Sequence, residues 1–107
     1  MHKTEIKNLI VFSKEGPAKN IFYDEGNIKA QLMCLKAGQV IPPCKMSNDV
    51  LFFVIRGEGV ITVDDEKAEL SEMVSMVVPS QAESRSISAK TDMVILAVQS
   101  RKDGDKK

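Results

Sequence analysis

Cys44 and Met46 are the residues whose types and spacing most directly suggest chemistry. They stand at i and i+2 of a segment that should be extended, so their side chains point the same way. A thiolate and a thioether are soft ligands that suit Cu(I), and Met33, Met73 and Met76 could add further sulfur. The pair is therefore a candidate site for a soft metal.

Two other interpretations of Cys44 stay open. Methionine and free cysteine are adaptable fillers of hydrophobic cores, and Cys44 could instead have a redox or nucleophilic role. A nucleophilic cysteine needs a base or a cation to lower its pKa. The only histidine, His2, lies near the N-terminus, and Lys45 should point to the opposite face. Cys34 fits a small core residue, with pairing to Cys44 as an alternative.

Length and composition limit the classes of protein to which this chain can belong. The 107 residues fit one domain, which we expect over residues 1–100, followed by a polar tail over 101–107. The 15 basic and 15 acidic residues give a net charge of zero, which argues against a nucleic-acid partner. No apolar run approaches the roughly 18 residues of a membrane span, and the apolar stretch at 9–12 is too short for the h-region of a signal peptide, so we expect a cytoplasmic protein without a membrane partner.

The elements that must position these residues are short strands. Residues 28–35 alternate, with Ile28, Ala30, Leu32 and Cys34 on one face of the strand. Residues 40–43 form an extended connection at an edge or bend, because two prolines cannot serve a central strand. Further strands are predicted at 8–12, 20–23, 50–55, 60–63, 68–70, 73–78, 84–88 and 93–98. About nine or ten short, closely spaced strands indicate an all-β sandwich or barrel.

Residues 31–99 resemble the cupin family, specifically its small single-domain members. The first cupin motif runs Gly, five residues, His-x-His, three or four residues, Glu, six residues, Gly, and Gly38 and Gly57 fit it. The second runs Gly, five residues, Pro-x-Gly, two residues, His, and Pro79 fits it. Residues 52–59 look like the family's strand into its Gly-x-Gly corner. The resemblance implies an antiparallel cupin-like β-barrel, also called a double-stranded β-helix or jelly roll.

The family's metal ligands are replaced in this sequence. Cys44 and Met46 stand at the two histidines of the first motif, Val50 at its glutamate, and Ser84 at the second-motif histidine. Cupin metal sites use imidazole and carboxylate, which hold borderline and hard divalent ions. Val50 cannot ligate and Ser84 is a poor neutral ligand, so we expect the barrel without its metal and without a cofactor.

The resemblance also implies which residues face the barrel interior. Asp49, Glu83 and Arg85, with Gln81, Ser84 and Ser86 near them, should rim or line the mouth, where polar groups could bind a small ligand. A solvated loop after Pro79 is the alternative. The cavity lining expected is Met33, Cys44, Met46, Asp49, Val50, Phe52, Met76, Gln81 and Ser84.

The function expected is a metal-free module that binds or senses a small-molecule ligand. One alternative is a cupin-type enzyme, an isomerase, epimerase or dioxygenase, with an atypical metal or with acid/base groups such as Asp49 and Glu83. Another is a structural protein whose barrel is packed shut. Small cupins pair through an outer sheet and an N-terminal strand, so the resemblance also implies a homodimer.

Overall fold

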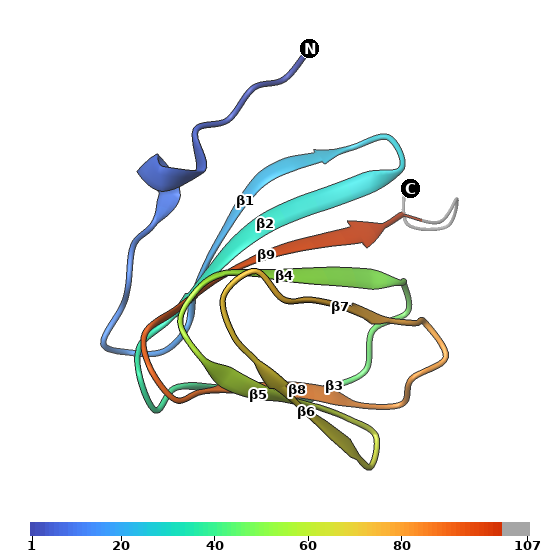
Figure 1. Ribbon diagram of the computed structural model, residues 1–107. Coiled ribbons are helices and arrows are strands. Elements are labelled where there is room, and N and C mark those ends of the chain that lie inside the picture. The colour runs from blue at the N-terminus through green and yellow to red at the C-terminus, as the bar shows by residue number, and fades with distance from the viewer. Residues whose placement is uncertain (102–107) are drawn as a thin grey trace.

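The chain folds into two antiparallel β-sheets that face each other (Figure 1). The computed structural model describes residues 1–101, so the predicted tail lies outside the described residues except for Arg101. Sheet A contains β1 (Ala18–Glu25), β2 (Ile28–Leu35), β9 (Met93–Ser100), β4 (Val50–Arg56) and β7 (Ser75–Val78), in that order across the sheet. Sheet B contains β3 (Val40–Cys44), β8 (Arg85–Ala89), β5 (Gly59–Val63) and β6 (Glu66–Leu70). The predicted all-β barrel is confirmed.

The two faces of sheet A bury different clusters, as the alternation of β2 predicted. Met33 and Leu35 belong to the core between the sheets. Leu32 and Cys34 point the other way and form an outer cluster with Val94. Neighbours along a strand point to opposite faces, so both sides of β2 are buried and the strand is apolar almost throughout.

The N-terminal segment differs from the prediction. The strand expected over residues 8–12 is wrong, because a 3-10 helix, η1 (Ile6–Leu9), and a non-strand segment occupy this region. Leu9, Ile10 and Phe12 pack on the outer cluster of sheet A. Their apolar character therefore reflects burial against a sheet face, which a short apolar run cannot distinguish from strand pairing.

The inner face of sheet A changes from apolar to polar along the barrel. Residues paired across antiparallel strands share a face, so the register defines rows of side chains. One row contains Met33, Ile95 and Val54, the next Gln31, Ala97, Phe52 and Met76, and the next Lys29, Gln99, Val50 and Val78. The barrel therefore has an apolar interior and a polar end near the start of β4.

The other end of β4 is closed by backbone. Gly57 has a φ of 92°, and a Cβ there would collide with the backbone of Asp92. The Glu58 carbonyl accepts hydrogen bonds from the N–H groups of Lys90 at 2.9 Å and Thr91 at 3.2 Å. This corner leaves no room for a ligand. Within residues 1–101, no helix combines the length and apolarity needed to cross a membrane.

Candidate functional site

A pocket of about 480 Å³ opens at the polar end of the barrel, and we call it the mouth pocket. Its lining residues come from β1, β2, β3, β8, β9 and the segment after β3: Lys19, Asn20, Ile21, Lys29, Gln31, Cys44, Met46, Arg85 and Gln99. Three of these side chains are cationic and none is acidic. The pocket is therefore positively charged within a chain whose net charge is zero.

Arg85 is the central residue of the mouth pocket. Along β8, Arg85, Ile87 and Ala89 are buried while Ser86 and Ser88 are partly exposed, so the arginine points inward by strand alternation. Arg85 as a whole is only 8% exposed, and its guanidinium carbon lies 5.1 Å from the centroid of the Phe52 ring. The buried Nε has no hydrogen-bond partner. Among the described residues, no carboxylate forms an ion pair with this guanidinium.

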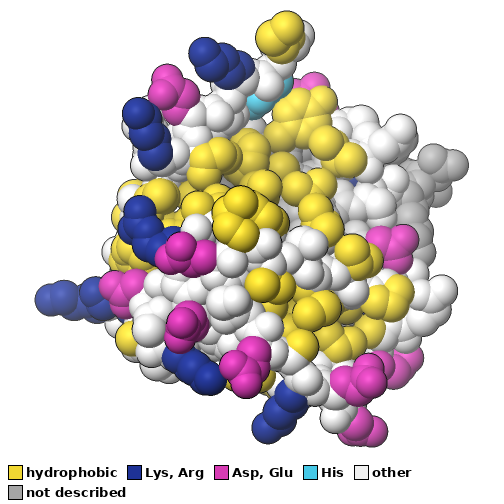
Figure 2. Space-filling view, in the orientation of Figure 1, with side chains coloured by type: hydrophobic (Ala, Val, Ile, Leu, Met, Phe, Trp, Pro, Cys, Tyr) yellow, Lys and Arg dark blue, Asp and Glu magenta, His cyan; other side chains and the backbone are white. Residues whose placement is uncertain are grey.

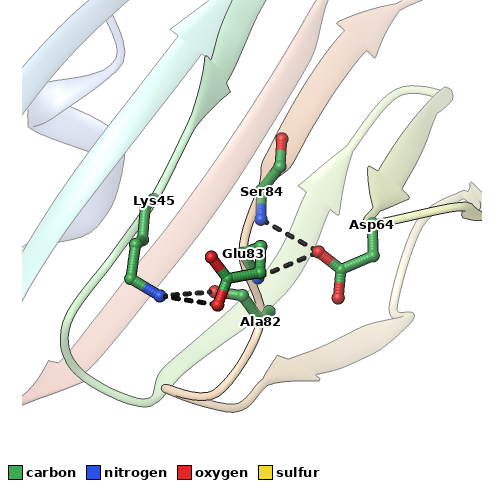
Figure 3. Close-up of polar contacts among 5 residues, drawn as sticks. All are labelled: Lys45, Asp64, Ala82, Glu83 and Ser84. Carbon is green, nitrogen blue, oxygen red and sulfur yellow. Dashed lines mark hydrogen bonds and ion pairs between the residues drawn. The ribbon is translucent and has the colours of Figure 1, made fainter.

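The backbone before Arg85 is held by side-chain braces (Figure 3). One Asp64 carboxylate oxygen accepts hydrogen bonds from the N–H groups of Glu83 at 2.9 Å and Ser84 at 3.0 Å. Lys45 reaches across from the segment after β3, with its Nζ 3.3 Å from Glu83 Oε2 and 3.5 Å from the Ala82 carbonyl. These contacts hold the backbone at the start of β8 and therefore help to position the Arg85 side chain inside the barrel.

A smaller pocket of about 250 Å³ adjoins the mouth pocket, and we call it the side pocket. Lys29 and Gln99, which are register partners, line both pockets. Asn48 also lines the side pocket, is 6% exposed, and has a buried Oδ1 without a hydrogen-bond partner. Arg101 lines it too, but its guanidinium is paired with Asp24 at 2.6 Å.

A third pocket, of about 500 Å³, lies between β7 and the β5–β6 hairpin, and we call it the edge pocket. Asp64 and Glu66 make its lining more acidic than basic, with Lys67 as the cation. Met76 lines it as well. In the row across the inner face of sheet A, Gln31 lines the mouth pocket and Met76 the edge pocket, with Phe52 between them.

The sequence-predicted cavity residues fall into four groups. Met33, Val50 and Phe52 are buried in the core. Cys44 and Met46 line the mouth pocket, where Cys44 is exposed, and Met76 and Gln81 line the edge pocket. Asp49 and Ser84 line neither of these two pockets. The single cavity that the prediction assumed is thus divided in two, because Phe52 and Arg85 fill the middle of the barrel.

Asp49 and Ser84 have structural contacts instead. The Asp49 carboxylate accepts a 2.7 Å hydrogen bond from the Ser80 N–H, and its carbonyl accepts one from the Ser100 N–H at 3.0 Å. Ser84 precedes β8 by one residue, and its N–H is committed to Asp64. Strand alternation makes Arg85, not Ser84, the inward residue at this level.

Sequence reasoning missed most of the polar residues at the mouth. Lys29, Gln31, Gln99 and Asn48 were not among the candidates, and Arg85 was expected to rim or line the mouth but was not included in the cavity lining. A signal was present for Arg85, because it shares the i, i+2, i+4 face of Ile87 and Ala89. Arginine is rarely buried without a partner, so an arginine on the apolar face of a strand is a candidate functional residue.

The donor set does not fit the divalent metal of a cupin site. Val50 offers no donor atom, Ser84 offers only a neutral hydroxyl, and the cationic side chain of the adjoining, largely buried Arg85 would repel a cation. Within residues 1–101, no group of three or more His, Cys, Asp or Glu residues could hold a metal ion. The soft-metal alternative rests on Cys44 and Met46, since Met73 lies in an exposed turn.

The two cysteines occupy different environments. Cys34 is buried in the outer cluster of sheet A, whereas Cys44 is exposed at the mouth, and both are free thiols, so the alternative of a Cys34–Cys44 disulfide is wrong. Burial raises the pKa of the Cys34 thiol, although a backbone hydrogen bond with Val11 and the charge of Arg56 act in the opposite direction. Cys34 is therefore a core residue of low reactivity.

Solved structures similar to this chain share its fold. A RmlC-like cupin from Desulfovibrio desulfuricans superposes with a TM-score of 0.83 at 21% identity, covering 94% of this chain and 96% of that one. A cupin superfamily protein from Desulfitobacterium hafniense gives 0.80 at 21% identity, covering 89% and 86%. Salicylate 1,2-dioxygenase from Pseudoaminobacter salicylatoxidans gives 0.74 at 20% identity, covering 78% of this chain and 25% of the enzyme.

Sequence comparison adds no closer relationship. No protein-family model and no curated protein matches the chain. The structural neighbours include an enzyme and a protein of unknown function from Streptococcus pyogenes, so they agree in architecture and differ in what is known of their activity. The described residues form a small cupin-type barrel.

Proposed function

We propose that the protein is a metal-independent module that binds a small organic anion in the mouth pocket, with Arg85 as the anchor. One observation carries the proposal: Arg85, which is 8% exposed, has an unpartnered Nε and forms no ion pair among the described residues, lines a pocket with three cations and no acid. A pocket of this size suits a small metabolite.

The physical argument starts from the cost of burying a charge. A cation removed from water destabilises the fold unless it is paired and hydrogen-bonded. The ring of Phe52 compensates Arg85 only in part, because a cation–π contact supplies no hydrogen-bond acceptor. A carboxylate in the mouth pocket would give Arg85 a charge-assisted hydrogen bond. Lys29 would add positive potential, and the amides of Gln31 and Gln99 would add donors.

Binding is a better account than catalysis by the predicted acid/base pair. Glu83 has a side chain that is 80% exposed and is paired with Lys45. The Asp49 carboxylate accepts a backbone hydrogen bond, and neither residue lines the mouth pocket. A general acid or base must reach the proton that it transfers. The enzyme alternative therefore lacks a group at the anion site, and a cytoplasmic binding or sensing role remains part of this proposal.

The test is a binding experiment with matched variants. Ligand-observed NMR and calorimetry would measure a panel of small carboxylates against the purified chain, with the corresponding neutral amides as controls. We expect carboxylates to bind preferentially, and Arg85→Met to weaken them roughly 10- to 100-fold, the range for a lost hydrogen bond to a charged group. Lys67→Met, which removes the cation of the edge pocket, should have no effect. Carboxylate binding that survives Arg85→Met, or that requires stoichiometric metal by elemental analysis, would contradict the proposal.

We also propose a homodimer formed through the outer face of sheet A. The register aligns Tyr23, Ala30, Val98, Leu51 and Val77 in one row across the five strands. Figure 2 shows hydrophobic side chains gathered across the part of the view that sheet A occupies. Leu51 is 38% and Val77 61% exposed, which leaves apolar surface for a second copy. The zero net charge adds no overall repulsion between copies.

Sedimentation equilibrium tests the dimer. The unaltered chain should sediment as a dimer, and Leu51→Glu should shift it to monomer because it places a charge within the apolar row. Glu69→Gln, on the opposite sheet, is the control and should leave the dimer intact. A chain that is monomeric from micromolar to millimolar concentration would rule out this interface.

A further inference from the structure

We infer that the ligand is a hydroxycarboxylate, whose carboxylate binds Arg85 in the mouth pocket and whose hydroxyl group binds Asn48 in the side pocket. This inference rests on the proposed function and narrows its ligand class. Arg85 and Asn48 are the two described residues with a buried side-chain atom, Nε and Oδ1 respectively, that has no hydrogen-bond partner, and each residue lines one of the two pockets.

The two pockets are adjacent parts of one polar end. Lys29 and Gln99 pair with each other in the β2–β9 ladder and line both pockets. A ligand that extends from Arg85 past this pair therefore reaches the space beside Asn48. The two volumes, about 480 and 250 Å³, suit a chain of several carbons better than a two-carbon acid.

The burial of Asn48 favours a ligand that places a hydrogen-bonding group beside it. The residue is 6% exposed, and a buried amide oxygen without a donor is costly, so native structures nearly always satisfy such an atom. A hydroxyl group can both donate and accept, so it suits an amide in either of its two orientations. An unsubstituted hydrocarbon chain at this position would leave the oxygen unsatisfied.

The charges of the side pocket favour a hydroxyl over an ammonium group. Lys29 and Arg101 line the pocket, and its single carboxylate, Asp24, is paired with Arg101 at 2.6 Å. The lining therefore has a net positive charge. A cationic donor beside Asn48 would be repelled, whereas a neutral hydroxyl would not.

The experiment uses six-carbon probes that differ in one property at a time. Gluconate carries both a carboxylate and hydroxyls, hexanoate only the carboxylate, glucitol only the hydroxyls, and 6-aminohexanoate a carboxylate with an ammonium group. Calorimetry on the full chain should give gluconate at least tenfold tighter binding than hexanoate, with glucitol and 6-aminohexanoate no tighter than hexanoate. Lactate and propionate form a second, shorter pair in case six carbons are too long.

Variants of Asn48 and Arg85 show how much the hydroxyl end and the carboxylate end of the ligand each contribute to its affinity. Asn48→Leu and Asn48→Ala should remove the advantage of the hydroxy acid and leave the affinity for its deoxy partner unchanged. Ser47→Ala is the neighbouring control and should alter neither. Arg85→Met should weaken every carboxylate. Two replacements at Asn48 are used because either one could perturb folding, which the thermal unfolding midpoint reports.

The outcomes separate the inference from the proposed function. If both hydroxy acids bind no tighter than their deoxy partners while Arg85→Met still weakens carboxylates, the inference is overturned and water is the partner of Asn48. Tighter binding of 6-aminohexanoate would overturn the choice of a hydroxyl. If no carboxylate depends on Arg85, the proposed function itself fails.

Discussion

The mouth pocket and the edge pocket lie on either side of Phe52 and are nearly equal in size, about 480 and 500 Å³. They differ in charge. The mouth pocket is lined by Lys19, Lys29 and Arg85 with no acid, whereas Asp64 and Glu66 outnumber the single lysine of the edge pocket.

Pocket volume alone does not locate the site, because the two pockets are nearly equal in size. In the edge pocket the Asp64 carboxylate already accepts two backbone hydrogen bonds, so it serves the fold. In the mouth pocket the buried Nε of Arg85 has no partner. Structures seldom leave a buried polar group unsatisfied without a reason, and such exceptions concentrate at functional sites. The mouth pocket is therefore the candidate site.

Removing the side chain of Phe52, which separates the two pockets, should have the largest effect on stability. Phe52→Ala deletes a fully buried aromatic ring and the cation–π contact with Arg85. We expect a loss of about 3–5 kcal/mol in the free energy of unfolding, measured by urea denaturation. Leu51→Ala, which changes the neighbouring side chain on the outer face, should cost much less. Equal losses for the two variants would show that Phe52 does not lie at the centre of the core.

Breaking the brace beneath Arg85 should have an intermediate effect. Asp64→Ala removes the acceptor of the Glu83 and Ser84 N–H groups, so we expect a loss of about 1–3 kcal/mol in unfolding free energy and weaker carboxylate binding. Asp64→Asn keeps an acceptor oxygen and tolerates the local φ of 53°, so it should recover much of both. Calorimetry with the same carboxylates would check the binding. A change in stability without a change in affinity would mean that the brace does not position Arg85.

Charge changes in the two pockets should have smaller effects on carboxylate binding, and the effects should differ between the pockets. Lys29→Met should weaken carboxylate binding roughly two- to fivefold, as expected for a partly exposed charge. Glu66→Gln in the edge pocket should not weaken it. Affinity should also fall as salt is raised, because exposed charges are screened. If Glu66→Gln were as damaging as Lys29→Met, the assignment of the anion to the mouth pocket would be wrong.

The smallest effect expected is in thiol reactivity. Cys44 is exposed in the mouth pocket, so a carboxylate ligand should slow its alkylation, while buried Cys34 should react only on unfolding. Burial raises the pKa of Cys34, so the folded chain holds this proton more tightly than the unfolded chain. That contribution to stability is complete below the ordinary pKa of 9.0 and is lost as pH rises through the folded value. Mass spectrometry of alkylated peptides would measure both thiols, and rapid native labelling of Cys34 would contradict its burial.

The sequence predicted the barrel well because strand alternation is a local property. Residues 28–35 form β2 with the predicted faces, and the predicted Gly-x-Gly corner at Gly57 is the closed end of the barrel. The apolar run at 8–12 was interpreted as a strand, because burial on a sheet and pairing within one leave the same apolar signature.

The site was predicted less well because its residues come together only through cross-strand register. Gln31, Gln99 and Arg85 lie far apart in the chain, and each alone resembles a surface residue. The family positions drew attention to Ser84, one residue from the inward-facing Arg85. A shift of one residue along a strand reverses the direction of the side chain, so a motif alignment without the structure selects the wrong neighbour.

The stability of ligand-free Arg85→Met most directly tests whether Arg85 is kept for an anionic ligand. If Arg85 is kept for an anionic ligand, its buried charge destabilises the empty protein, and methionine should raise the unfolding free energy by about 1 kcal/mol or more in urea denaturation. The same variant should show no stabilisation by added carboxylate. If Arg85→Met instead lowers stability by several kcal/mol, the arginine is a structural residue with its partners already in place, and the anion site does not exist.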